Sequence, residues 1–305
     1  MYEAHFGFDK KPFSLLPDPS FLYFSDKHSG ALAMLEYGIM EQSGITVITG
    51  DIGAGKTTLV RHLLRRLKNN NMRIGLINNT HASLGEFMGW FALAYDLDCE
   101  GLGSVGTYKK IQEFLVSEYA ESRRVVLFID EAQNMKKSQL EEVRLLSNIN
   151  ADDDLLLQVV LIGQPELRKK LSSPALVQMA QRVSTEYHLE PLKDLETLKY
   201  IRHRLSAAGG DSNIFDVNAM GAIYSYTRGV PRLINTLCDQ SLAYAYGKDV
   251  KKVDMRTVIE VAQSKKIGGV NFHAKKVGDD SPEVRAEKPS RIGMLKQSLK
   301  TNPLK

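Results

Sequence analysis

The chain of 305 residues contains only two cysteines, Cys99 and Cys238, which lie far apart in the sequence. Neither belongs to a CxxC pair or a zinc-ligand spacing, so the sequence indicates a reducing compartment rather than a disulfide-rich domain. No uninterrupted apolar run reaches about 18 residues, the length that a membrane-spanning helix needs. The opening MYEAHFGFDKKPF lacks a basic segment followed by an apolar core, and therefore predicts no signal peptide. We expect a cytoplasmic protein that reaches the inner face of the membrane only by recruitment.

The net charge is low at +4, but it is unevenly distributed. Residues 265–305 contain ten Lys or Arg and four Asp or Glu, which leaves a net charge of −2 on residues 1–264. This distribution indicates a local anionic contact rather than a broad nucleic-acid surface. The basic tail is rich in glycine, lysine and proline without periodicity, so we expect it to be mostly disordered. Within it, residues 291–300 are either a solvated chain end or a basic amphipathic helix that forms on a partner or a membrane.

Short apolar runs alternate with amphipathic segments through the first two thirds of the chain. This pattern predicts an α/β domain in which a buried parallel sheet is covered on both faces. The predicted strands are 45–49, 73–78, 125–130, 155–163 and 185–189. The first predicted helix starts at Ser25 or Asp26 and runs to about Gln42. Further helices are predicted at 55–68, 83–97, 107–121 and 137–149, and in a segment that ends near Ala180.

After Pro191 the pattern changes to helices only, at 194–208, 216–227, 231–247 and 254–265. We therefore divide the chain into four regions. Residues 1–25 form an extended N-terminal linker that packs on the core, and residues 26–190 form the α/β nucleotide-binding domain. Residues 191–264 form a helical lid, and residues 265–305 form the basic tail.

The stretch GDIGAGKTT follows the first predicted strand and leads into a helix. It matches G-x-x-x-x-G-K-[ST], in which glycines let the backbone curl so that successive N–H groups face phosphate oxygens. Lys56 is expected to reach the β- and γ-phosphates, and the Thr57 hydroxyl to coordinate Mg²⁺. The predicted phosphate-binding residues are Gly50, Asp51, Ile52, Gly53, Ala54, Gly55, Lys56, Thr57 and Thr58.

Hydrolysis also needs a second metal ligand and a group that activates water, and VVLFIDE supplies two acids at the end of an apolar strand. Asp130 is expected to hold Mg²⁺ and Glu131 to act as the general base. Gln164 ends the strand LLLQVVLIG, which fits between the other two motif strands. Either the Gln164 amide senses the γ-phosphate, or the residue merely starts the GQPEL turn.

Three arginines are further candidates for the site. Arg182, just before the fifth strand, is placed to project into the nucleotide of a neighbouring subunit, with Arg168 as the rival for that role. Arg232, in RGVPRLIN, is placed to reach back from the lid to the γ-phosphate. The alternative for each of the three is an ordinary surface arginine.

With these motifs in order, the chain resembles the AAA+ ATPases. More narrowly, it resembles the general secretion pathway protein A family, including the ATPases of exosortase or exopolysaccharide loci and of mannose-sensitive pilus biogenesis. The resemblance rests on YEAHFGFDKKPFSLLPDPSFLYFS, GDIGAGKTTL, LFIDEAQN, LIGQPELRKKL and RGVPRLINTLCD. It implies an αβα sandwich with strand order 5-1-4-3-2, a helical lid, ATP and Mg²⁺ as ligands, and an opening segment near the adenine. It also implies the family roles of the motif residues Lys56, Thr57, Asp130, Glu131, Gln164, Arg182 and Arg232.

The resemblance further implies a homo-oligomeric ATPase that assists assembly or export of a cell-envelope component with a membrane-associated partner protein. Members of the family usually continue into a transmembrane helix and a peptidoglycan-binding domain, where this sequence has a short basic tail. An alternative is a DNA-associated ATPase of the transposition type, against which the charge of −2 on residues 1–264 argues. A nucleotide-loaded scaffold without turnover is the third alternative, and the presence of Glu131 counts against it.

Overall fold

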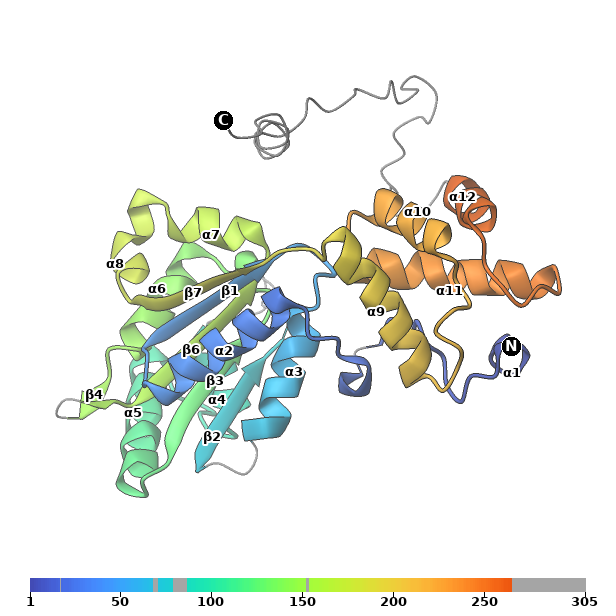
Figure 1. Ribbon diagram of the computed structural model, residues 1–305. Helices are drawn as coiled ribbons and strands as arrows, with labels where there is room; N and C mark the ends of the chain where they lie inside the picture. Colours follow the sequence, from blue (N-terminus) through green and yellow to red (C-terminus); the bar gives the residue numbers. More distant parts are fainter. Residues whose placement is uncertain (17, 68–70, 79–86, 152–153, 265–305) are drawn as a thin grey trace, which may run out of the picture. The chain divides into compact units, whose positions relative to one another are not determined.

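The computed structural model describes residues 1–16, 18–67, 71–78, 87–151 and 154–264. A five-stranded parallel sheet lies at the centre of the α/β domain (Figure 1). Its strands are β1 (Ile45–Gly50), β2 (Met72–Ile77), β3 (Arg124–Ile129), β6 (Leu157–Gly163) and β7 (Val183–Leu189). They are arranged in the order β2-β3-β6-β1-β7, which confirms the predicted order 5-1-4-3-2.

Helices cover both faces of the sheet, as the apolar strands require. Along β3, Val126 and Phe128 belong to one buried cluster, whereas Val125 and Leu127 belong to another. The first cluster includes side chains of α2 (Asp26–Met40) and α3 (Lys56–Leu67). The second includes side chains of α4 (Phe87–Ala94), α5 (Ser104–Ala120), α6 (Lys137–Leu146) and α7 (Pro165–Leu171). The αβα sandwich is confirmed.

Four helices between Asp194 and Ser264, which we call the helical subdomain, follow the last strand of the sheet. This subdomain has its own buried cluster, separate from the two that cover the sheet. Its helices are α9 (Asp194–Ala207), α10 (Val217–Thr227), α11 (Pro231–Gly247) and α12 (Met255–Ser264). None of the helices within the described residues combines the length and the apolar character needed to cross a lipid bilayer.

The N-terminal segment, expected to be an extended linker on the core, lies against both α3 of the α/β domain and the helical subdomain. It contains a short helix, α1 (Glu3–Phe6), and a 3-10 turn, η1 (Pro19–Phe21). Its buried aromatic side chains belong to the cluster of the helical subdomain: Tyr2, Phe6, Phe8, Phe13 and Phe21. The faces of the sheet are already covered by helices, whereas the four helices of the subdomain leave apolar surface that these rings close.

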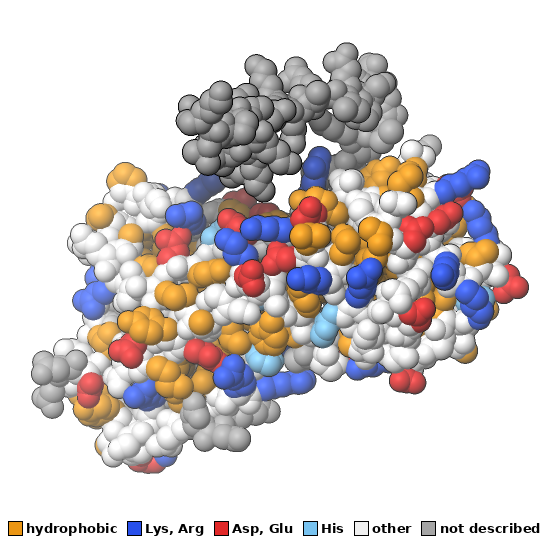
Figure 2. Space-filling view, in the orientation of Figure 1, with side chains coloured by type: hydrophobic (Ala, Val, Ile, Leu, Met, Phe, Trp, Pro, Cys, Tyr) orange, Lys and Arg blue, Asp and Glu red, His pale blue; other side chains and the backbone are white. Residues whose placement is uncertain are grey.

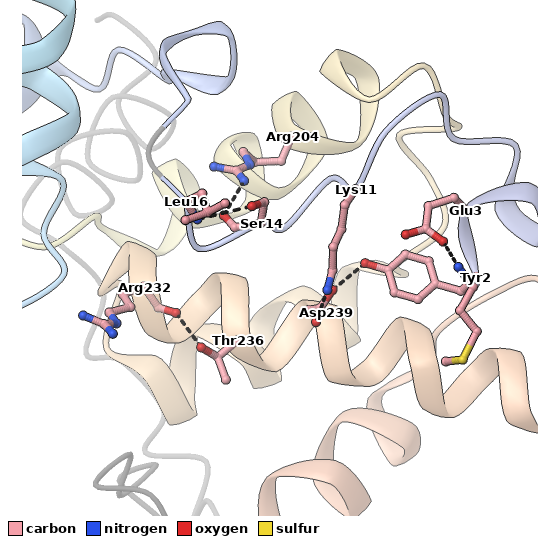
Figure 3. Close-up of polar contacts among 10 residues, drawn as sticks. Tyr2, Glu3, Lys11, Ser14, Leu16, Arg204, Arg232, Thr236 and Asp239 are labelled. Atoms are coloured by element: carbon pink, nitrogen blue, oxygen red, sulfur yellow. Dashed lines mark hydrogen bonds and ion pairs between the residues drawn. The ribbon is translucent and has the colours of Figure 1, made fainter.

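Polar contacts fix the same segment to the helical subdomain (Figure 3). Lys11 forms an ion pair of 3.1 Å with Asp239 of α11, and the Tyr2 hydroxyl donates to the same carboxylate. Arg204 of α9 donates from Nε to the carbonyl of Pro12 over 2.7 Å. Its Nη2 donates to the carbonyl of Ser14 over 3.2 Å (Figure 3). The N-terminal segment and the helical subdomain therefore share one core and one set of hydrogen bonds.

Several element boundaries differ from the sequence prediction. A small hairpin of β4 (Asn150–Ala151) and β5 (Asp154–Leu155) precedes β6, so the predicted strand 155–163 begins at Leu157. The helix predicted to end near Ala180 is broken into α7, η3 (Pro174–Leu176) and α8 (Val177–Ala180). Proline cannot continue a helix from the preceding turn, and Pro174 accounts for this break. The predicted tail 265–305, with its segment 291–300, lies outside the described residues, as do residues 83–86.

Candidate nucleotide site

The loop between β1 and α3 has the backbone that a phosphate-binding turn requires. Gly53 and Gly55 have φ angles of +81° and +100°, in the region that favours glycine. Gly50 has a different reason to be glycine, since a Cβ there would lie 2.6 Å from the carbonyl oxygen of Leu189. The loop ends where α3 begins, at Lys56, so the amino end of that helix faces the same space.

Lys56 is buried, with 7% of its surface exposed, and its ammonium is held by the loop itself. Its Nζ donates to the carbonyls of Gly50 over 2.7 Å and Asp51 over 3.0 Å. Burial lowers the pKa of Lys56, while the nearby carboxylates of Glu131 and Asp130 act in the opposite direction. A buried cation among acids and carbonyls is suited to bind a polyanion such as a triphosphate.

The two residues predicted to hold Mg²⁺ are in direct contact. The Thr57 hydroxyl donates to Oδ2 of Asp130 over 3.1 Å, and Oδ1 of Asp130 accepts the N–H of Glu131 over 2.9 Å. A hydroxyl and a carboxylate are the oxygen ligands that Mg²⁺ prefers, so the donor set fits this ion.

Glu131 follows directly and has a left-handed backbone, with φ of +54°. Two amides donate to its Oε2. One is Nε2 of Gln164, at 3.2 Å, and the other is Nε2 of Gln133. The predicted base and the predicted sensor are therefore joined by a hydrogen bond. Gln133 was not among the predicted residues, although it stands in the quoted motif LFIDEAQN.

A cavity of about 380 Å³ lies beside these side chains, a volume within the range of small-ligand sites. The α/β domain, the helical subdomain and the N-terminal segment all contribute to its wall. Of the predicted residues, the wall includes Ile52, Gly53, Gly55, Lys56, Thr57, Thr58, Glu131, Gln164 and Arg232. Unpredicted wall residues include Leu15, Leu16, Tyr23, His28, Tyr200 and Arg204.

Arg232 lies at the beginning of α11, where its N–H donates to the carbonyl of Gly53 over 3.2 Å. The helical subdomain thus touches the phosphate-binding loop itself. From α2, the buried ring of His28 makes a second contact with this loop, with Nε2 3.1 Å from the carbonyl of Ala54. A carbonyl only accepts, so Nε2 carries the proton. A lone histidine 26 residues upstream offers no sequence pattern by which to find it.

The structure does not bring Arg182 and Arg168 to this cavity. Arg182 immediately precedes β7, whose Val183 pairs with Ile45 at the start of β1, whereas Leu189 pairs with Gly50 at its end. Arg182 therefore lies at the edge of the sheet away from the phosphate-binding loop of its own chain. Arg168 forms an exposed ion pair of 2.9 Å with Glu186.

Residues 39–171 match the family model of the AAA domain, a range that holds the loop, both acids and Gln164. This range therefore holds an AAA domain. The chain is 39% identical over 256 residues to general secretion pathway protein A of Aeromonas hydrophila, which covers 83% of this chain but 46% of that protein. The chain thus spans about half the length of this curated relative.

Solved structures share the fold of this AAA+ domain and its helical subdomain. Cdc6p of Pyrobaculum aerophilum aligns with a TM-score of 0.65 at 16% identity, over 83% of this chain and 70% of that one. ORC2 of Aeropyrum pernix, described in complexes with ADPNP and ADP, aligns with a TM-score of 0.61 at 16% identity, over 83% and 71%. At this identity the likeness shows the fold alone.

Proposed function

We propose that this AAA+ domain hydrolyses ATP to ADP and phosphate in a Mg²⁺-dependent reaction. The observation that carries the proposal is the contact of Thr57 with Asp130 beside the buried Lys56, with Glu131 next in the chain. Lys56 and Thr57 begin α3, whereas Asp130 and Glu131 directly follow β3. Lys56, Thr57 and Glu131 line one cavity. The AAA family match supports the same activity.

In this proposal each side chain has one task. Lys56 leaves the carbonyls of Gly50 and Asp51 and binds the β- and γ-phosphates. Thr57 and Asp130 hold Mg²⁺, which when bound neutralises charge on the phosphates. Glu131 accepts a proton as water attacks the γ-phosphorus, and the bond to the bridging oxygen of ADP breaks.

Further residues would stabilise the charge that develops on the transferred phosphoryl group. Gln164 contacts the γ-phosphate and reports its presence to Glu131 through their shared hydrogen bond. Arg232, which lines the cavity from the helical subdomain, stabilises negative charge on the γ-phosphate. Arg182 acts on the nucleotide of a neighbouring copy, because it lies too far from its own site. This last role makes a homo-oligomer the working form.

We further propose that ATP hydrolysis assists assembly or export of a cell-envelope component through a membrane-associated partner protein. Secretion, pilus and exopolysaccharide systems are the candidate settings. The identity of 39% with general secretion pathway protein A supports this proposal. On the face seen in Figure 2, acidic and basic side chains are interspersed and do not form a patch of one sign. A cytoplasmic location with recruitment to the inner face of the membrane fits this task.

Phosphate release from ATP by the purified chain, with Mg²⁺ or with EDTA, tests the activity. Glu131→Gln should lower turnover by about 100-fold or more, because the general base is lost, and keep ATP binding within about twofold. Glu113→Gln, at an exposed position of α5, is the matched control and should behave as the wild type. An inactive wild type, or a fully active Glu131→Gln, would contradict the proposal.

A further inference from the structure

Gln133 lies in the 3-10 turn η2 (Ala132–Asn134), immediately after the acid pair. Its half-buried amide both donates and accepts a hydrogen bond. Nε2 donates to Oε2 of Glu131, and Oε1 accepts the backbone N–H of Gln164 over 3.0 Å. Asparagine and glutamine are the neutral side chains that offer both a carbonyl oxygen and an N–H₂ donor. Gln133 therefore bridges the carboxylate of one strand end and the backbone of another.

The turn that carries Gln133 is itself fixed to helix α7. Lys170, in the last turn of α7, donates to the backbone carbonyl of Gln133 and, over 2.7 Å, to that of Met135. Gly163 leaves the room that the amide occupies, since a Cβ there would lie 3.0 Å from Oε1 of Gln133. Because its backbone is anchored to α7, the Gln133 amide cannot turn away from Glu131 without losing its contact with the N–H of Gln164, the N-cap residue of α7.

Two amides thus reach Glu131 from different elements and meet at the same oxygen. Gln164 reaches it from the end of β6, and Gln133 from the turn after β3. A carboxylate on a flexible side chain loses rotamer freedom only when such contacts hold it. Orientation of a general base within hydrogen-bond reach of its water is a condition for efficient proton transfer.

We propose that Gln133 is a positioning residue that holds the Glu131 carboxylate toward the attacking water and joins its orientation to Gln164 and helix α7. The inference rests on the proposed ATP hydrolysis. It gives Gln133 a role that is not among the roles of the predicted motif residues. Oε1 of Gln133 accepts the backbone N–H of Gln164, so a shift of that backbone on γ-phosphate binding would also move the Gln133 amide. The Gln133 amide then carries this shift to the base.

Gln133→Met tests the role, because methionine has a similar length but lacks the amide. We expect kcat for ATP to fall by about tenfold or more, with KM and the Kd of a non-hydrolysable ATP analogue within about twofold. The midpoint of thermal unfolding should stay near that of the wild type. Gln181→Met, at an exposed glutamine, is the matched control and should change none of these values.

The deciding measurement places Gln133→Met in a Glu131→Gln background. If Gln133 acts only through Glu131, the second substitution should lower the residual turnover by less than about twofold, since coupled residues are not additive. A further tenfold loss there, an unchanged kcat in the single variant, or a loss confined to the Kd and the unfolding midpoint would overturn the inference. An inactive wild type would instead refute the proposed function.

Discussion

The Thr57 hydroxyl donates to Oδ2 of Asp130 over 3.1 Å, although the two residues are 73 positions apart. Thr57 follows β1, and Asp130 follows β3, with β6 between these strands. Because the carboxyl ends of parallel strands meet at one edge, the sheet itself brings the two oxygen ligands together.

Thr57→Val keeps the shape of threonine and removes the hydroxyl. We expect the Mg²⁺ concentration needed for half-maximal ATP hydrolysis to rise by about tenfold or more, because one ligand is lost. Thr57→Ser retains the hydroxyl and should stay within about threefold of the wild type. Equal Mg²⁺ titrations for valine and serine would show that this hydroxyl does not serve the metal.

Gly53→Ala should destabilise the chain at the contact between the loop and the helical subdomain. A Cβ at Gly53 would lie 2.4 Å from Cβ of Arg232, and φ is +81°. Strain of this kind costs about 1–3 kcal/mol in the free energy of unfolding, which urea titration measures. Gly221→Ala is the control, because it lies inside α10 and its Cβ would meet nothing within 4 Å. The control should be neutral or gain about 0.5–1 kcal/mol.

His28 predicts how stability depends on pH. Burial lowers its pKa below the ordinary 6.5, so below this pH the unfolded chain binds a proton that the folded chain does not. The contribution of His28 to the free energy of unfolding therefore falls as pH drops through 6.5, and levels off below the folded pKa. His28→Gln should show a shallower loss between pH 7.5 and about 5.5 in urea titrations.

His62→Gln is the comparison for this measurement. Burial also lowers the pKa of His62, but its ring is half-exposed, so this substitution should change the loss less than His28→Gln does. It should retain the loss that belongs to His28. If His28→Gln lost stability as steeply as the wild type over this range, the buried ring would not be the source.

Mixed oligomers test the placement of Arg182. Arg182→Ala should lower turnover by roughly 10³-fold if this arginine serves a neighbouring site. Mixing it with Glu131→Gln subunits should restore turnover, because each inactive form supplies what the other lacks. Arg168→Ala should remain active alone, since Arg168 already pairs with Glu186 on its own surface. Mixtures that stay inactive would refute the role across subunits.

The sequence predicts most of the sheet and the centre of the site, for a physical reason. Strands such as β3 and β6 are apolar throughout because both faces are covered, so they are visible as short apolar runs. The phosphate-binding loop and the acid pair are local motifs at strand ends. Once the strand order was known, the convergence of Lys56, Asp130 and Glu131 followed from it.

The features that the sequence did not predict depend on contacts between distant segments. The aromatic residues of the N-terminal segment indicate burial, but not the surface that buries them, and they pack on the helical subdomain. Gln133 acquires its contacts from the turn η2 and from Lys170, which no periodicity reveals. The break at Pro174 was visible in the sequence, yet the segment was interpreted as one helix.

The central claim is that the cavity beside Lys56 binds a triphosphate, and equilibrium titration of ATP with Mg²⁺ tests it most directly. Lys56→Met removes a buried cation that would hydrogen-bond to phosphate, so the Kd should rise by about tenfold or more relative to the wild type. Lys169→Met, at an exposed lysine of α7, should leave the Kd unchanged. ATP binding by Lys56→Met as tight as that of the wild type would contradict the account.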